Sequence, residues 1–107
     1  MKPGFKPSKI FCFQDEVEYS SNGIVSKKVI KSDSGNISLF AFDKGEHLSE
    51  HTAPFDALIQ VIDGSARITI GGIPHLITQG NSIIMPANIP HAVEAVERFK
   101  MILTMIR

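Results

Sequence analysis

The histidines of this chain are its best candidates for chemistry. They are His47, His51, His75 and His91. A neutral imidazole can ligate a divalent metal, hydrogen-bond a polar ligand, or act as a general base near neutral pH. Each histidine also has a plainer interpretation as a hydrogen-bonded core or surface residue, and that interpretation is the stronger one for His47 and His75 taken singly.

Other reactive groups give little support for a mechanism. Ser49 and Ser82 lie in no nucleophile-elbow motif, and Cys12 has no histidine near it in the sequence. The glycines are placed as turn residues rather than as a phosphate-binding loop between a strand and a helix. A single cysteine excludes an intrachain disulfide, and we expect Cys12 to be a buried structural thiol in a reducing cytoplasm.

Length and charge narrow the class of protein. The chain has 107 residues, of which 43% are hydrophobic, so it can bury the core of one domain. Its 11 basic and 11 acidic residues give no net charge, which argues against nucleic-acid and membrane-surface binding. No apolar run approaches the roughly 18 residues of a membrane span. We therefore expect a cytoplasmic protein whose partners are a small-molecule ligand and a second copy of itself.

The elements that would position the histidines are expected to be short strands. Apolar runs alternate with turn signals, a pattern typical of a sandwich or barrel. The expected strands cover residues 24–31, 36–42, 58–62, 66–70, 76–78, 82–85 and 91–96. Two segments are ambiguous. Residues 8–22 carry apolar residues at helical spacing, and residues 92–106 fit either a helix or a strand that is apolar on both faces.

Two groups of residues stand at linked spacings around His51 and His91. The matching positions are Gly45, His51, Gly64, Gly80, Pro86 and His91. In this they resemble the two signature motifs of the cupin superfamily, and the resemblance favours the strand over the helix at the C-terminus. It implies an all-β fold, the cupin-type double-stranded antiparallel β-helix or jelly-roll barrel. Residues 1–107 would form a single domain, with 1–22 as an arm that contacts a dimer partner and 36–107 as the barrel.

The chain departs from these motifs at positions that bind the metal in metal-containing cupins. Cupins that bind a metal use two histidines and a glutamate of the first motif and the histidine of the second. Here Ala53 and Ala57 stand at the second histidine and the glutamate, so only His51 and His91 of that set are present. His47 has the alternation expected of a residue on the same face as His51 and is our candidate for a third ligand. Two alternatives stay open: one divalent transition metal (Zn, Fe, Mn, Ni or Cu) and no metal.

The resemblance places a ligand pocket inside the barrel. The candidate ligand-binding residues are His51, His91, His75, Met85, Phe40, Phe42, Phe55, Ile59 and Val61. Three functions are compatible with them: a metal-dependent enzyme of dioxygenase or isomerase type, a metal-free binding or sensing module, and a metal-free catalyst with one histidine as general base. We also expect a homodimer, because an apolar C-terminal strand at the edge of a sheet would need a cover.

Overall fold

The computed structural model describes residues 5–107, so residues 1–4 of the expected arm lie outside the described part of the chain. One 3₁₀ turn, η1 (Phe13–Asp15), is followed by strands alone. The strands are β1 (Ile24–Ser32), β2 (Gly35–Phe42), β3 (His47–His51), β4 (Asp56–Asp63), β5 (Ser65–Ile70), β6 (Ile73–Thr78), β7 (Ser82–Met85), β8 (His91–Ala95) and β9 (Phe99–Ile106). Both ambiguous segments are resolved: residues 8–22 form no α-helix, and the C-terminal segment is strand.

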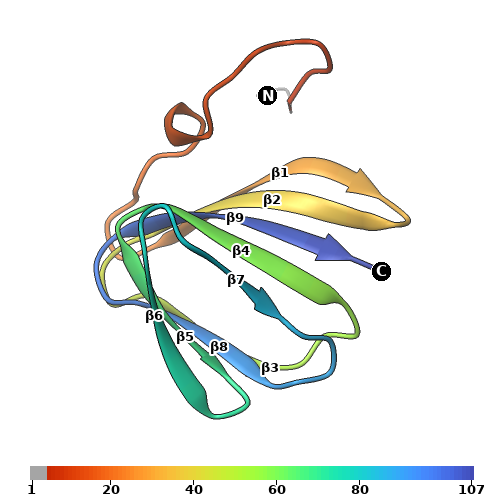
Figure 1. Ribbon diagram of the computed structural model, residues 1–107. Helices are drawn as coiled ribbons and strands as arrows, with labels where there is room; N and C mark the ends of the chain where they lie inside the picture. The colour runs from red at the N-terminus through yellow and green to blue at the C-terminus, as the bar shows by residue number, and fades with distance from the viewer. Residues whose placement is uncertain (1–4) are drawn as a thin grey trace.

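The strands form two antiparallel sheets that face each other as a jelly roll (Figure 1). The larger sheet has the order β1-β2-β9-β4-β7 and the smaller has the order β3-β8-β5-β6. The all-β barrel predicted from the sequence is therefore confirmed. In Figure 1 the strands converge on the left and fan out on the right, and we call these two ends of the barrel the closed end and the open end.

On β9 and β5, burial falls along the inner face from the closed end to the open end, whereas Ala57 of β4 and Met85 of β7 stay buried at the open end. On β9, Phe99 and Met101 are no more than 1% exposed, whereas Leu103 and Met105 are only half-buried. On β5, Ala66 and Ile68 are fully buried while Ile70 is not. Because these residues alternate along their strands, they line one interior. The closed end is thus a packed core, and the inner faces of β9 and β5 are less completely packed at the open end.

Strand β9 is not an edge strand, which corrects the premise of our dimer prediction. It lies between β2 and β4 in the larger sheet, so both of its backbone edges are paired. Its outer apolar residue Ile102 is 7% exposed because it packs in a second cluster with Val17 of the arm. The chain therefore covers this face itself, and the homodimer stays a prediction without that argument.

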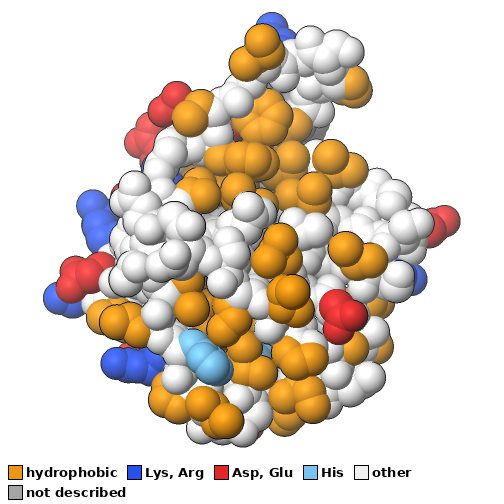
Figure 2. Space-filling model, viewed as in Figure 1, with side chains coloured by type: hydrophobic (Ala, Val, Ile, Leu, Met, Phe, Trp, Pro, Cys, Tyr) orange, Lys and Arg blue, Asp and Glu red, His pale blue; other side chains and the backbone are white. Residues whose placement is uncertain are grey.

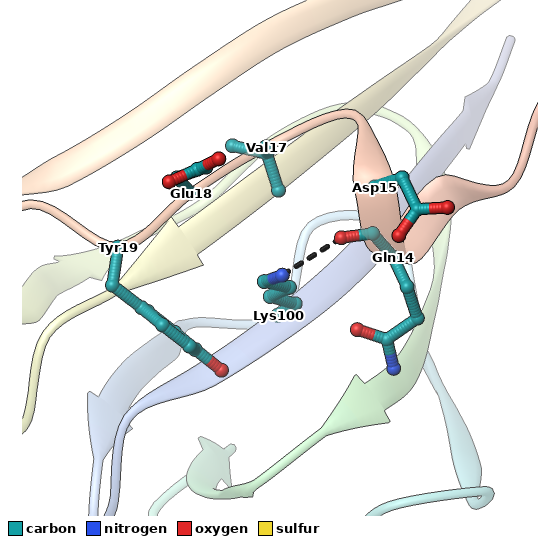
Figure 3. A pocket seen from close by; sticks show the side chains of 6 residues that line it. All are labelled: Gln14, Asp15, Val17, Glu18, Tyr19 and Lys100. Atoms are coloured by element: carbon teal, nitrogen blue, oxygen red, sulfur yellow. Dashed lines mark hydrogen bonds between the residues drawn. The ribbon is translucent and has the colours of Figure 1, made fainter.

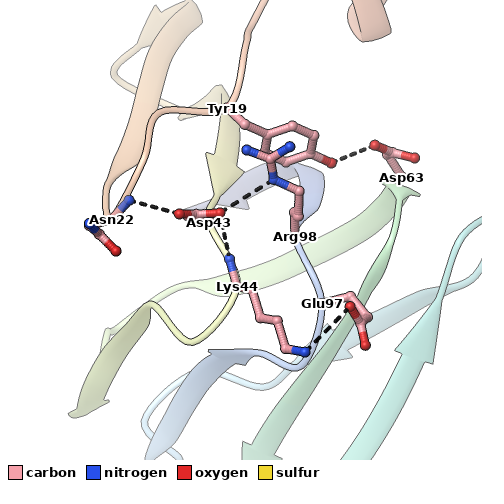
Figure 4. Close-up of polar contacts among 7 residues, drawn as sticks. All are labelled: Tyr19, Asn22, Asp43, Lys44, Asp63, Glu97 and Arg98. Atoms are coloured by element: carbon pink, nitrogen blue, oxygen red, sulfur yellow. Dashed lines mark hydrogen bonds and ion pairs between the residues drawn. The ribbon is translucent and has the colours of Figure 1, made fainter.

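Polar contacts hold the arm, residues 5–22, on the barrel. The Tyr19 hydroxyl donates to Asp63 Oδ2 at 2.5 Å, and the Arg98 guanidinium lies 4.5 Å from the centre of the Tyr19 ring (Figure 4). Burial, followed by the hydrogen bond to the Asp63 carboxylate, raises the pKa of Tyr19. The Asp43 carboxylate accepts hydrogen bonds from the backbone N–H groups of Asn22 and Lys44, which lower its pKa. These contacts keep the arm over the larger sheet.

Lys100 of β9 also connects the barrel to the arm. Its ammonium donates to the backbone oxygen of Gln14 at 2.8 Å, beside a pocket of about 350 Å³ (Figure 3). Cys12, at the start of this turn, is exposed, so our expectation of a buried thiol is wrong. The reason is that the arm covers the sheet with Val17 and aromatic side chains and leaves Cys12 on its outer side.

Within residues 5–107, no helix is both long and apolar enough to cross a membrane.

Candidate ligand site at the open end of the barrel

His51 and His91 meet at the open end of the smaller sheet. They are paired directly across β3 and β8, and their ring centroids lie 4.4 Å apart with an interplanar angle of 68°. His91 is only 6% exposed, whereas His51 is exposed at the rim. The next residue across the sheet on the same face is Ile70, which packs against the main core. Two imidazoles from separate strands thus form one polar pair beside an apolar wall.

Backbone contacts fix the orientation of both rings. His51 Nδ1 lies 2.9 Å from the carbonyl oxygen of Ser49, and His91 Nδ1 lies 3.3 Å from that of Ile89. A carbonyl oxygen only accepts, so each Nδ1 carries the proton and donates it. In a neutral imidazole the other nitrogen is then a lone-pair acceptor. In the neutral form of either ring, Nε2 is therefore an acceptor, and neither Nε2 has a hydrogen-bond partner in residues 5–107.

The surroundings of His91 lower its pKa and so favour its neutral form. Burial lowers its pKa below the ordinary value of 6.5, the hydrogen bond to Ile89 opposes that shift, and the nearby His51 lowers the pKa further. An imidazole with a lowered pKa is unprotonated at neutral pH. The buried member of the pair is therefore an acceptor of hydrogen bonds under ordinary conditions.

His47 lies on the opposite face of the sheet from His51, contrary to our expectation. The pairing of β3 with β8 shifts between Leu48 and His51, as in a β-bulge, so three residues on β3 span two on β8. The extra residue reverses the alternation. Leu48 packs against the core, and His47 instead faces outward beside Glu94 in an outer groove of about 360 Å³. His47 cannot share a ligand with the His51 and His91 pair from that face.

His75 is on the inner face but away from the pair. It lies opposite Ile68 on the edge strand β6, with β5 between β6 and β8. Neighbouring strands are about 4.8 Å apart, so the backbones of His75 and His91 are separated by roughly two strand spacings. His75 therefore does not join the pair formed by His51 and His91.

The apolar residues predicted to line the pocket divide between the two ends. Met85 pairs with Ala57 at the open end, and half-buried Phe40 lies midway along β2. Phe42, Ile59 and Val61 are 1% exposed or less and belong to the packed core. The remaining candidate, Phe55, precedes β4 and lies under the Arg107 guanidinium at 5.0 Å.

Two polar residues of the interior were missed by the sequence analysis. Asn36 and Ser38 alternate with Phe40 along β2 and therefore share its inner face. Ser38 is only 5% exposed, and Asn36 Oδ1 is buried with no hydrogen-bond partner in the described residues. Asn36 lies in one row with Met105, Ala57 and Met85 across the larger sheet. The alternation with Phe40 and Phe42 was the signal that could have revealed them.

The donor set does not complete the metal site of metal-binding cupins. Ala57, at the glutamate position, is 5% exposed and pairs with Met85 and Met105, so no oxygen donor stands there. Among the described residues, no group of three or more histidine, cysteine, aspartate or glutamate side chains is arranged to hold a metal. Catalytic metal sites usually take three protein ligands. His51 and His91 supply two.

Comparisons with known proteins agree with this fold. The sequence profile of the family described as "Cupin domain" matches residues 38–107, and the chain belongs to the cupin family. A conserved protein of unknown function from Streptococcus pyogenes is 31% identical, with a TM-score of 0.93 over 98% of this chain and 92% of that one. A search of curated proteins finds no match to this chain.

Other solved structures extend the likeness. A cupin 2 conserved barrel domain protein from Leptotrichia buccalis is 41% identical, with a TM-score of 0.85 over 88% of this chain. This chain covers 46% of the Leptotrichia protein, about half its length. A salicylate 1,2-dioxygenase from Pseudaminobacter salicylatoxidans has a TM-score of 0.73 at 12% identity, over 78% of this chain and 26% of that one, and shows the shared fold alone.

Proposed function

We propose that this protein binds a small organic molecule at the open end of its barrel, with the imidazoles of His51 and His91 as polar contacts. The observation that carries the proposal is the pair itself: two rings 4.4 Å apart on the inner face of a barrel that is otherwise mostly apolar. A concave apolar surface with a few convergent polar groups is the usual form of a small-molecule site. Ile70 supplies apolar surface next to His91, and Met85 and Met105 are apolar residues of the other sheet that pair with Ala57.

The proposed binding does not require a metal. Both Nε2 atoms carry lone pairs, so a hydroxyl or amide N–H of the ligand can donate to each imidazole directly. A hydrogen bond made away from bulk water contributes about 0.5–1.5 kcal/mol. Two such bonds, added to the burial of an apolar body, are enough for specific binding of a small ligand.

The test uses the outward-facing histidine as a matched control. Binding of 1,4-benzenedimethanol, a probe with an apolar ring and two hydroxyl groups, is measured by NMR titration in the presence of EDTA. We expect His51→Ala and His91→Ala each to weaken binding roughly three- to tenfold. His47→Ala removes an imidazole from the other face of β3 and should leave binding unchanged. Equal loss in all three variants would contradict the proposed site.

A metal-dependent enzyme of dioxygenase or isomerase type is the second candidate. The observation that favours it is the anchoring of both Nδ1 atoms to backbone carbonyl groups, an outer-shell contact that metal-binding histidines usually make. Because the chain supplies only two such donors, the organic substrate and water would have to fill the remaining positions of an ion. A bound divalent ion would act there as a Lewis acid.

Elemental analysis of protein purified without a histidine tag distinguishes the two candidates. The second candidate requires Zn, Fe, Mn, Ni or Cu near one equivalent in the wild type and in His47→Ala, and a loss of that metal in His51→Ala and in His91→Ala. Probe binding that persists in EDTA, with no stoichiometric metal, is the result expected for the first candidate.

A further inference from the structure

The strongest unexplained feature of the interior is the amide of Asn36. Its Oδ1 is buried and has no partner in the described residues, although buried polar atoms nearly always have one. An unpaired buried acceptor is unfavourable, typically by more than a hydrogen bond contributes when it is made. Asn36 therefore needs a donor that the described chain does not supply.

The position of Asn36 indicates where such a donor would lie. Asn36 begins the inner stripe of β2 and pairs with Met105, which packs against the main core. His51 is the last residue of β3 and His91 is the first residue of β8. Both strand ends lie at the open end of the barrel (Figure 1), on the smaller sheet. Facing sheets lie about 10 Å apart. A molecule resting on the imidazoles from one sheet can therefore reach Asn36 on the other.

The groups on the two walls also restrict the charge of the molecule. His51 Nε2, His91 Nε2 and Asn36 Oδ1 are all acceptors, and acceptors repel an anionic oxygen. The inner stripes of β4, β5, β7 and β9 carry no cationic side chain. Lys28 and Lys31 on the inner side of β1 pair with Ser38 and Asn36, but both lysines are exposed to water at the edge of the larger sheet.

We propose that the molecule bound at the open end is neutral and donates hydrogen bonds to both walls, to His51 and His91 on the smaller sheet and to Asn36 on the larger. This inference rests on the proposed function and adds the class of ligand: a compact alcohol, diol or amide with an apolar body and donors at both ends. Ser38, the next residue on the β2 stripe, has a hydroxyl that lies deeper in the same interior.

Three probes that share one benzene ring test the proposal. Benzyl alcohol has one donor, 1,4-benzenedimethanol has two donors at opposite ends, and 4-(hydroxymethyl)benzoate replaces one donor by an anion. We expect the two-donor probe to bind wild-type protein roughly three- to tenfold more tightly than benzyl alcohol. The benzoate should bind most weakly.

Variants at Asn36 assign the second contact. Asn36→Leu keeps the approximate volume of the side chain but removes its amide, and it should reduce binding of the two-donor probe to the level of benzyl alcohol. Thr104→Val is the matched control, because it removes a polar group from the outer face of β9, next to Met105, the cross-strand partner of Asn36. The side-chain amide resonances of Asn36 in a ¹H–¹⁵N spectrum should move with the two-donor probe and not with benzyl alcohol.

The outcomes separate this inference from the proposed function. Equal affinities for the first two probes, unchanged in Asn36→Leu, would overturn the contact with Asn36 while leaving the histidine pair as the site. Tightest binding by the benzoate would overturn the neutral ligand class. A wild-type protein that binds none of the three probes would contradict both proposals together.

Discussion

The two ends of the barrel each hold a pair of rings at nearly the same separation, yet in opposite surroundings. At the closed end, Phe42 and Phe99 stack with centroids 4.5 Å apart and planes at 17°, and both are fully buried. At the open end, His51 and His91 lie 4.4 Å apart with planes at 68°, and His51 is exposed. The first pair buries apolar surface, while the second presents unpaired acceptors.

The same strands carry the packed core at one end and the histidine pair at the other. The same strand β9 supplies fully buried Phe99 at one end and half-buried Met105 at the other. A residue near the closed end therefore contributes mainly through the hydrophobic effect and packing. A residue at the open end is free to be polar because less apolar surface depends on it.

Truncating the closed-end pair should have the largest effect on stability. Phe99→Ala removes a fully buried ring and should lower the free energy of unfolding by about 3–5 kcal/mol. Met105→Ala on the same inner stripe should cost less than half as much, because that side chain is only half-buried. Urea denaturation followed by circular dichroism measures both values. Equal losses would show that the open end is packed as tightly as the closed end.

Substitution of a turn glycine should also destabilise the protein more at the closed end than at the open end. Gly64, at the closed end, has φ +73°, and a Cβ there would lie 1.8 Å from the backbone oxygen of Arg98. Gly72, in the turn at the open end, has φ +82° with nothing within 4 Å. Gly72→Ala should cost about 1–2 kcal/mol from its backbone conformation alone. Gly64→Ala should cost more, and thermal unfolding of the two variants side by side tests the order.

The sequence was sufficient to predict the architecture. The expected segment 82–85 is the observed β7, and the expected segment 36–42 lies within β2. The resemblance to the two motifs also predicted that His51 and His91 would meet. They are paired across neighbouring strands, as the last residue of β3 and the first residue of β8. Periodicity and turn residues are local signals, and the jelly roll is rich in them.

The sequence was insufficient where a single residue changes direction or where distant segments pack. A bulge between Leu48 and His51 reverses the face of His47, and no residue type in that stretch announces it. The apolar outer side of β9 suggested a partner subunit, but Val17 of the chain's own arm covers it. The alternation along β2 could have placed Asn36 on the inner face, but only the structure shows that its Oδ1 is buried without a partner in the described residues.

Acidification from pH 7.5 to pH 5 should produce the smallest effect, and we expect it to act through His91 at the open end. The folded pKa of His91 is lowered, so the unfolded chain takes up its proton first as the pH falls. The stability that His91 contributes is therefore complete above about pH 6.5 and declines below it until the folded pKa is passed. Asp43, whose pKa is also lowered, loses its contribution only near and below its ordinary value of 3.8, so the two windows are distinct.

Urea midpoints from pH 7.5 to pH 5 should fall in wild-type protein, and His91→Gln should flatten that slope. Titration of the His91 ring by NMR should give a pKa below 6.5, and His51→Ala should raise it only part of the way back, because burial rather than His51 is the larger cause. A complete return to 6.5 in His51→Ala would instead mean that His91 is as solvated as its partner. In that case the contrast between a buried and an exposed imidazole at the open end would be wrong.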